Sequence, residues 1–188
     1  MRGVRLLHSE VSQPLRVRRL TDPDLDPLDR KALADIAEHG LHVPYILPQD
    51  NSPGWHFSVG MFATYGQPEV VAFGLDEQVG HFLVNELGRQ ARDGVSLTPD
   101  GLYPDLLEGV SCILKPIARV WYPPLLGYAR WYYCGEYFPA LQCIWPDHAQ
   151  VFPWEPGFPV RWRSVQPLLW HEATSEAGMK PILDTLKD

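Results

Sequence analysis

An acid, a base and a hydroxyl fall close together in one short part of this sequence. His56 and Ser58 are two residues apart in a segment with strand-like alternation, so an extended chain would place them on one face. Glu69 opens the next predicted strand, which we expect to run back beside the first. Three such groups in one patch could transfer protons. The alternative is that a helix covers this face and that the three groups satisfy one another.

A second candidate is Arg130, which stands beside Tyr132 in an aromatic-rich segment. A guanidinium next to aromatic rings can hold a carboxylate or a phosphate. It can equally pair with Asp147 or Glu155 and hold down the loop that carries them. The sequence favours this structural pairing and leaves ligand binding open.

The loop itself, residues 145–159, is called the proline-aromatic loop below. Its four prolines exclude a helix, because each removes a backbone donor and fixes φ. Asp147 and His148 could act as an acid–base pair, although an Asp after Trp-Pro is first a turn residue. Trp145 and Trp154 could offer flat apolar surfaces to a ligand. We predict that any small-molecule pocket has three walls, namely the polar face of residues 55–61, a helix at residues 130–133 and this loop.

Metal and cofactor signatures are missing from the sequence. His39 and His42 have H-x-x-H spacing, but Gly40 should end a helix between them. The sequence contains no C-x-x-C, H-E-x-x-H, G-x-G-x-x-G, P-loop or G-x-S-x-G motif. We therefore expect no metal and no cofactor.

Composition indicates a globular protein. The chain has 188 residues, of which 45% are hydrophobic, and its net charge is −7. A chain of this length fits one domain, and its acidity argues against nucleic-acid binding. The sequence has no secretory signal and no apolar run long enough to cross a membrane. Three cysteines without pairing motifs favour a reducing compartment, so we expect a cytoplasmic protein.

The first 20 residues differ from the rest, since they hold five arginines against one glutamate. We interpret this segment as a tail or as an arm that docks onto an acidic partner, with a second copy of the chain as one candidate.

The elements that must position these residues alternate between helix and strand. We predict helices over residues 30–39, 76–93 and 125–135, and strands over residues 41–47, 55–64, 69–75, 110–121 and 141–145. Residues 161–188 suggest a weak strand and one helix near residues 180–186. This order predicts a single α+β domain with a mostly antiparallel sheet, a β-hairpin and two or three packing helices. Residues 1–27 would be the arm and linker, residues 28–160 the domain and residues 161–188 an extension. The predicted core contains Trp55, Phe57, Val59, Val71, Phe73, Phe82, Leu83, Ile113 and Ile144.

Several motifs occur in the order found in a known family. They are G-W-H-F-S-V-G-M at residues 54–61, G-Q-P-E-V at 66–70, A-R-W-Y-Y at 129–133, L-Q-C-I-W-P-D at 141–147 and F-P-W-E-P-G at 152–157. Together they resemble the bacterial Domain of Unknown Function 4262 (DUF4262) family over residues 38–159. Two positions differ from the family pattern, since Ser58 stands where Thr is common and Gln67 where His is common. The resemblance implies no particular reaction.

Two functions follow from these observations. The first is a small-ligand-binding or protein-interaction domain, favoured by the aromatic loop and the lack of a catalytic motif. The second is an enzyme of unassigned chemistry, for example a hydrolase, working from His56, Glu69 and Arg130. Convergence of those three side chains in an open pocket would favour the enzyme, and their burial in mutual hydrogen bonds would favour the binding protein.

Overall fold

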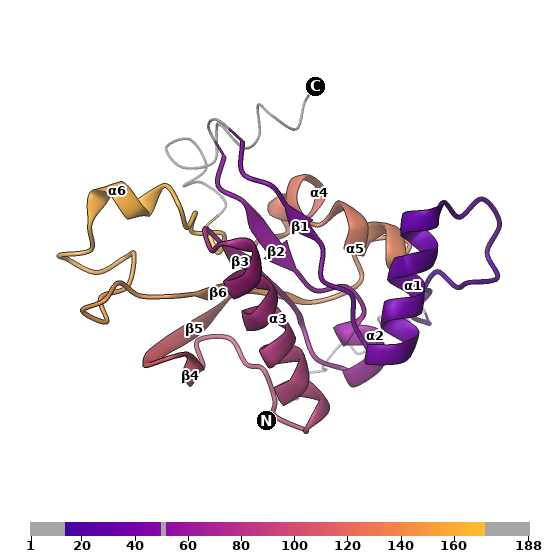
Figure 1. The fold of residues 1–188 in the computed structure, drawn as a ribbon, viewed down its shortest axis with the longest axis horizontal. Helices are drawn as coiled ribbons and strands as arrows, with labels where there is room; N and C mark the ends of the chain where they lie inside the picture. Colours follow the sequence, from indigo (N-terminus) through magenta and orange to yellow (C-terminus); the bar gives the residue numbers. More distant parts are fainter. Residues whose placement is uncertain (1–13, 50–51, 172–188) are drawn as a thin grey trace, which may run out of the picture.

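A six-stranded sheet in the order β1-β2-β3-β6-β5-β4 runs through the computed structural model, which describes residues 14–49 and 52–171 (Figure 1). The strands are β1 (Tyr45–Ile46), β2 (Trp55–Phe57), β3 (Glu69–Phe73), β4 (Leu102–Leu107), β5 (Val110–Pro116) and β6 (Ala140–Ile144). Only the β3–β6 pair is parallel among these neighbours. The single α+β domain with a mostly antiparallel sheet is therefore confirmed.

Helices cover both faces of the sheet. They are α1 (Pro27–His39), α2 (Met61–Tyr65), α3 (Glu77–Arg92), α4 (Tyr122–Leu125), α5 (Gly127–Tyr132) and α6 (Val160–Arg163), with a 3₁₀ turn, η1 (Arg119–Trp121). Figure 1 shows α3 lying across the sheet, with α1 and α5 towards one end of the molecule and α6 at the other. Within the described residues, no helix is both long and apolar enough to cross a membrane.

The alternation of side chains along β3 divides the core into two parts. Val71 and Phe73 face a cluster that includes residues of α1, α4 and α5. Val70 and Ala72 face the opposite cluster, which includes the buried side of α3. Both faces of β2, β3 and β6 are buried, so polar side chains on these strands must find partners inside the protein.

Helix α3 follows its prediction closely except at Phe82. Asp76 caps the helix by accepting a hydrogen bond from the Val79 amide at 2.9 Å. The buried face runs through Gly80, Leu83, Val84, Leu87, Gly88 and Ala91. Gly80 brings this face close to His56 of β2, and Gly88 brings it close to Leu41. Phe82 falls outside this face with 57% of its surface exposed. Placing Phe82 in the core was wrong, and Ile113 is only half-buried, whereas the other predicted core residues are buried.

The strand predicted over residues 55–64 is half wrong, because its second part is helix α2. The backbone leaves the strand at Gly60, which adopts a left-handed φ of 108°, and α2 begins at Met61. Strands β2 and β3 still pair antiparallel, with Trp55 opposite Phe73 and Phe57 opposite Val71. The tight hairpin lies instead between β4 and β5, where Leu107 pairs with Val110.

Other predicted elements are shorter than expected. The strand over residues 41–47 contracts to β1, with an isolated bridge between His42 and Val59. The strand over 110–121 ends at Pro116, and the helix over 125–135 contracts to α5, with the separate helix α4 ending at Leu125. Strand β4 was missed because Pro104 interrupts it, which an edge strand tolerates. A short helix, α6, replaces the weak strand expected after residue 160.

The described ends of the chain pack onto this framework. The Gln142 side chain donates to Pro167 O and accepts from the Leu169 amide, and Leu169 is fully buried. Residues 166–169 therefore pack as part of the domain. At the other end, the Arg18 amide donates to Tyr132 O at 2.8 Å, so this part of the arm docks on its own α5. The helix predicted near residues 180–186 lies outside the described residues.

Candidate functional site

Glu69 is completely buried and forms the densest polar cluster among the described residues. Its Oε1 accepts hydrogen bonds from the amides of Gly60 and Phe62, at 3.0 and 3.1 Å, and from the Tyr133 hydroxyl. Its Oε2 accepts a hydrogen bond of 2.5 Å from Ser58 Oγ. The Ser58 oxygen in turn accepts from the Val70 amide. One carboxylate on β3 thus joins the residue after β2, the start of α2 and the residue after α5.

This cluster is built to hold the fold. Burial raises the pKa of Glu69 above its ordinary value, and the hydrogen bonds from Ser58 and Tyr133 oppose that rise. Burial and the neighbouring Glu69 likewise raise the pKa of the Tyr133 hydroxyl. Ser58 and Glu69 have no exposed surface, so no substrate can reach them in this conformation. The sequence left open that the polar groups of this patch hydrogen-bond to one another, and Ser58 and Glu69 do so.

His56 is buried on the other face of the sheet. Its ring stacks on Tyr45, with centroids 4.1 Å apart and planes 5° from parallel, and it also packs against Gly80 of α3. Neither ring nitrogen has a hydrogen-bond partner with acceptable geometry, although the Glu77 backbone lies nearby. Burial lowers the pKa of His56 from 6.5 to about 4, so the ring is neutral at pH 7.

The proton-transfer set of His56, Ser58 and Glu69 is therefore wrong as a single patch. His56 pairs with Ala72, which faces the α3 side. Glu69 lies on the side of Val71, where it meets Tyr133. The sheet separates the two groups, because the antiparallel register pairs His56 with Ala72, and Glu69 lies on the opposite face of β3 from Ala72.

Arg130 pairs with neither of the carboxylates expected. Its Nε lies 2.8 Å from Glu136 Oε1, in an ion pair whose members are both more than one-third exposed. Asp147 instead accepts hydrogen bonds from the Ala149 and Val151 amides, at 2.9 Å each. Glu155 accepts from the Phe152 amide at 2.7 Å. Both carboxylates thus organise their own loop, and the predicted pairing of Arg130 with either one is wrong.

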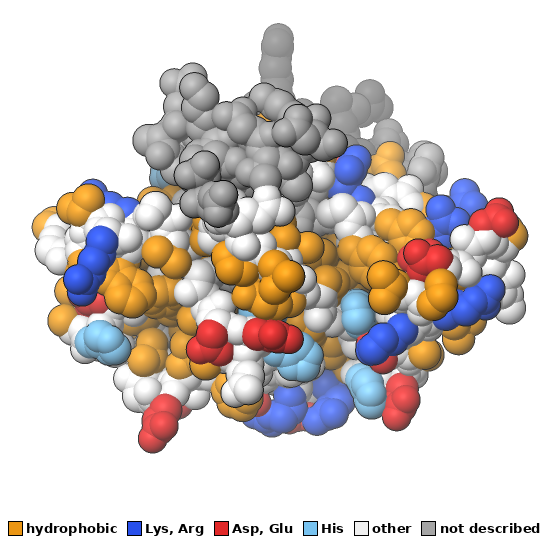
Figure 2. Space-filling model, turned by 45° about the horizontal axis from the view of Figure 1, so that its top comes forward, with side chains coloured by type: hydrophobic (Ala, Val, Ile, Leu, Met, Phe, Trp, Pro, Cys, Tyr) orange, Lys and Arg blue, Asp and Glu red, His pale blue; other side chains and the backbone are white. Residues whose placement is uncertain are grey.

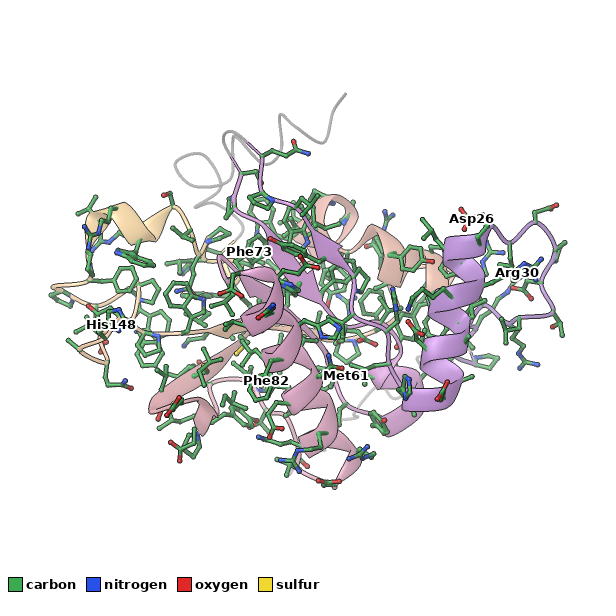
Figure 3. All side chains as sticks on the ribbon, in the orientation of Figure 1. Asp26, Arg30, Met61, Phe73, Phe82 and His148 are labelled. Carbon is green, nitrogen blue, oxygen red and sulfur yellow. The ribbon has the colours of Figure 1, made fainter. Side chains whose placement is uncertain are left out.

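The three-walled pocket is also wrong. Helix α5 and the chain after it precede β6, whereas the proline-aromatic loop leaves the other end of that strand. Tyr128 of α5 donates to Asp29 of α1 at 3.1 Å, which places α5 beside α1. Figure 3 shows His148 of the loop at the opposite end of the molecule from Asp26 and Arg30, which flank or belong to α1. Tyr132 is buried in the core against Tyr133, and His148 is exposed.

The proline-aromatic loop is fixed to the body of the domain at Trp145. The Trp145 indole donates to Phe73 O at 2.9 Å, and its ring meets Trp162 edge to face at 5.8 Å. The fully buried side chain of Gln166 accepts from the Trp145 amide at 3.1 Å and donates to Trp145 O at 2.8 Å. These contacts bring residues 162–168 next to the loop.

An open hollow of about 220 Å³ lies between these two segments, lined by Pro153, Trp154, Arg163, Gln166 and Leu168. Trp154 stacks on Phe152 at 4.9 Å and meets Trp170 at 5.4 Å. The Lys115 ammonium lies 5.2 Å from the Trp154 ring centroid and 5.5 Å from that of Trp170, and it also pairs with Asp100. The wall formed by Trp154 is therefore held from several sides.

Sequence reasoning identified Trp154 but missed Arg163, Gln166 and Leu168. The mixture of arginine and tryptophan at residues 161–163 was a signal, although no local pattern could show that this segment folds back onto the loop. A smaller hollow of about 120 Å³ lies where α1, α2 and α3 meet, but its Arg89 and Arg92 lie beside carboxylates of α3 and its C-terminal cap. In the described ranges, no three His, Cys, Asp or Glu side chains gather closely enough to hold a metal ion.

Charged side chains of both signs are interspersed on the face drawn in Figure 2, with hydrophobic side chains between them. This face carries no broad patch of one sign among the residues shown in colour.

Comparison with known proteins gives a family and no activity. The profile of the family described as Domain of unknown function (DUF4262) matches residues 35–159, and the chain belongs to this family. Comparisons with curated proteins and with solved structures found no match.

Proposed function

We propose that this member of the DUF4262 family is a small-ligand-binding protein, and that the hollow beside the proline-aromatic loop is its binding site. The observation that carries the proposal is an open concavity that combines an indole, an arginine and two apolar side chains. Binding sites are typically concave and largely preformed, with a few polar groups among apolar ones. The volume suits a fragment-sized ligand, because drug-sized ligands need about 300 Å³ or more.

The geometry does not favour an enzyme that works from His56, Glu69 and Arg130 together. His56 and Glu69 lie on opposite faces of the sheet, and Arg130 pairs with Glu136. None of the three residues lines either of the two hollows described above. A hydrolase working from these three residues would need them to converge around a substrate.

The cytoplasmic location is likewise a proposal. Cys112, Cys134 and Cys143 are all free thiols, as is usual for proteins of a reducing compartment.

The test is a fragment screen followed by NMR of the tryptophan indole N–H signals. Trp154→Phe identifies the signal of Trp154. We expect hits that shift this signal and that bind at least tenfold more weakly to Trp154→Ala. Tyr137→Ala is the matched control, because Tyr137 is an exposed aromatic residue outside the hollow. Hits that bind Trp154→Ala as tightly as the wild type, or a screen without hits, would contradict the proposal.

A further inference from the structure

The side chains that line the hollow differ in what they can still bind. The Gln166 amide is buried and is engaged on both of its ends by the Trp145 backbone. Pro153 and Leu168 offer apolar side chains. Trp154 and Arg163 remain, and both side chains can only donate hydrogen bonds.

Neither donor group is used within the described part of the chain. Arg163 is exposed, and the structure gives its guanidinium no ion pair and no hydrogen bond there. The Trp154 indole N–H likewise donates to no described residue, although its ring has neighbours. Arg161, two residues before Arg163, instead lies over the Trp162 ring at 5.9 Å and does not line the hollow.

Lys115 does not supply a second free cation. Its ammonium is paired with Asp100 and lies near the Trp154 and Trp170 rings. Its charge therefore holds the wall in place, and Arg163 is left as the group able to bind a ligand. Among the residues that the structure describes, Arg163 thus has no carboxylate partner, on a chain whose net charge is −7.

We infer that the hollow takes a small carboxylate, or another oxyanion with the same oxygen geometry, attached to a compact apolar body. A guanidinium holds a carboxylate through two parallel N–H···O bonds, and charge-assisted bonds of this kind are the strongest available to it. The apolar body would lie against Pro153, Leu168 and the exposed part of Trp154. This inference rests on the proposed function and names the chemical class of its ligand.

Three probes of similar shape test which ligand charge the hollow prefers. Benzoate, benzyl alcohol and benzylamine each carry one ring and differ in the charge of the attached group. The Trp154 indole signal is followed by NMR during titration of the full chain with each probe. We expect benzoate to bind at least tenfold more tightly than benzyl alcohol, and benzylamine to bind most weakly.

Two variants test whether Arg163 is the cation that binds the carboxylate. Arg163→Gln should weaken benzoate binding by about tenfold to a hundredfold, the usual effect of losing a charge-assisted contact. Its affinity for benzyl alcohol should stay within about twofold. Arg161→Gln is the matched control and should change neither affinity. An unchanged benzoate affinity in Arg163→Gln, or preference for the neutral or cationic probe, would overturn the inference and leave ligand binding itself standing. Failure of all three probes to shift the Trp154 signal would count against the inference and the proposed function together.

Discussion

Ser58 Oγ donates a hydrogen bond of 2.5 Å to Glu69 Oε2, and neither side chain has any exposed surface. Both residues lie in the first two sequence motifs of the family, and Tyr133, which also donates to Glu69, ends the third. These motifs therefore supply the framework that joins β2, β3 and α2. The fifth motif, at residues 152–157, contributes Pro153 and Trp154 to the hollow.

Replacing Glu69 with Ala should destabilise the domain strongly. The change leaves the Ser58 and Tyr133 hydroxyls and the Gly60 and Phe62 amides without their acceptor inside the protein. We expect a loss of at least about 3 kcal/mol in the free energy of unfolding, measured by urea denaturation. Glu38→Ala is the control, because Glu38 is exposed and should cost no more than about 0.5 kcal/mol. Similar losses of unfolding free energy in both variants would show that the hydrogen bonds to Glu69 do not stabilise the domain.

His56 should make the domain sensitive to acid. Its pKa is about 4 when folded, against 6.5 as its ordinary value. Between these values His56 is protonated in the unfolded chain but not in the folded protein. The contribution of His56 to the free energy of unfolding is therefore fully present above about pH 6.5 and is lost as the pH falls towards 4. The loss attributable to His56 approaches about 3 kcal/mol.

The measurement compares wild type with His56→Phe at pH 7 and pH 4. The stability difference between the two proteins should shift in favour of the variant by about 3 kcal/mol on acidification. Other titrating groups, such as Glu69, are present in both proteins, so their effects on the free energy of unfolding cancel in this difference. A difference that is independent of pH would mean that His56 does not stay neutral in the folded protein.

Gly80 is required by the position of the His56 ring. A Cβ at residue 80 would lie 2.1 Å from His56 Nδ1, well inside contact distance. Gly80→Ala should therefore cost about 1–3 kcal/mol, although the same change in an open helix usually stabilises. Gly127→Ala in α5 is the matched control, because nothing lies within 4 Å of the added carbon. The cost should disappear largely in Gly80→Ala combined with His56→Ala, and its persistence there would contradict the explanation.

Arg130→Met should change stability little. The Arg130–Glu136 ion pair is more than one-third exposed on both sides, and solvent screens such pairs. We expect a loss of less than about 1 kcal/mol in thermal or urea unfolding. A cost of about 3–5 kcal/mol would instead indicate a buried carboxylate that depends on Arg130.

Local patterns predicted helices α1 and α3 and strands β3 and β6 well. Asp76 and the apolar spacing after it were enough to locate α3, and the run before Trp145 was enough to locate β6. Phe82 was placed in the core because its apolar side chain fits the hydrophobic spacing, which takes no account of glycines. In the structure, Gly80 and Gly88 belong to the buried face of α3 instead. Helix α2 was missed because the alternation continues through Met61. What ends the strand is a tertiary contact, since the Glu69 carboxylate binds the amides of Gly60 and Phe62.

The candidate site was predicted only in part. Trp154 was identified from its surroundings in the proline-aromatic loop, and it does line the hollow. Its neighbours Arg163 and Gln166 follow the loop in the chain and reach it through the hydrogen bonds of Gln166 with Trp145. Such a return of the chain depends on tertiary contacts, which include those of Gln166 and Trp162 with Trp145 and those of Gln142 with residues 167 and 169. No periodicity in the sequence reports them.

The most direct measurement is a crystal structure of the protein soaked with the tightest-binding fragment of the NMR screen. We predict density for the fragment in the hollow, in contact with Trp154 and Leu168 and with its acceptor group facing Arg163. Density at another surface, with the hollow empty at a saturating fragment concentration, would contradict the central claim that this hollow is the binding site.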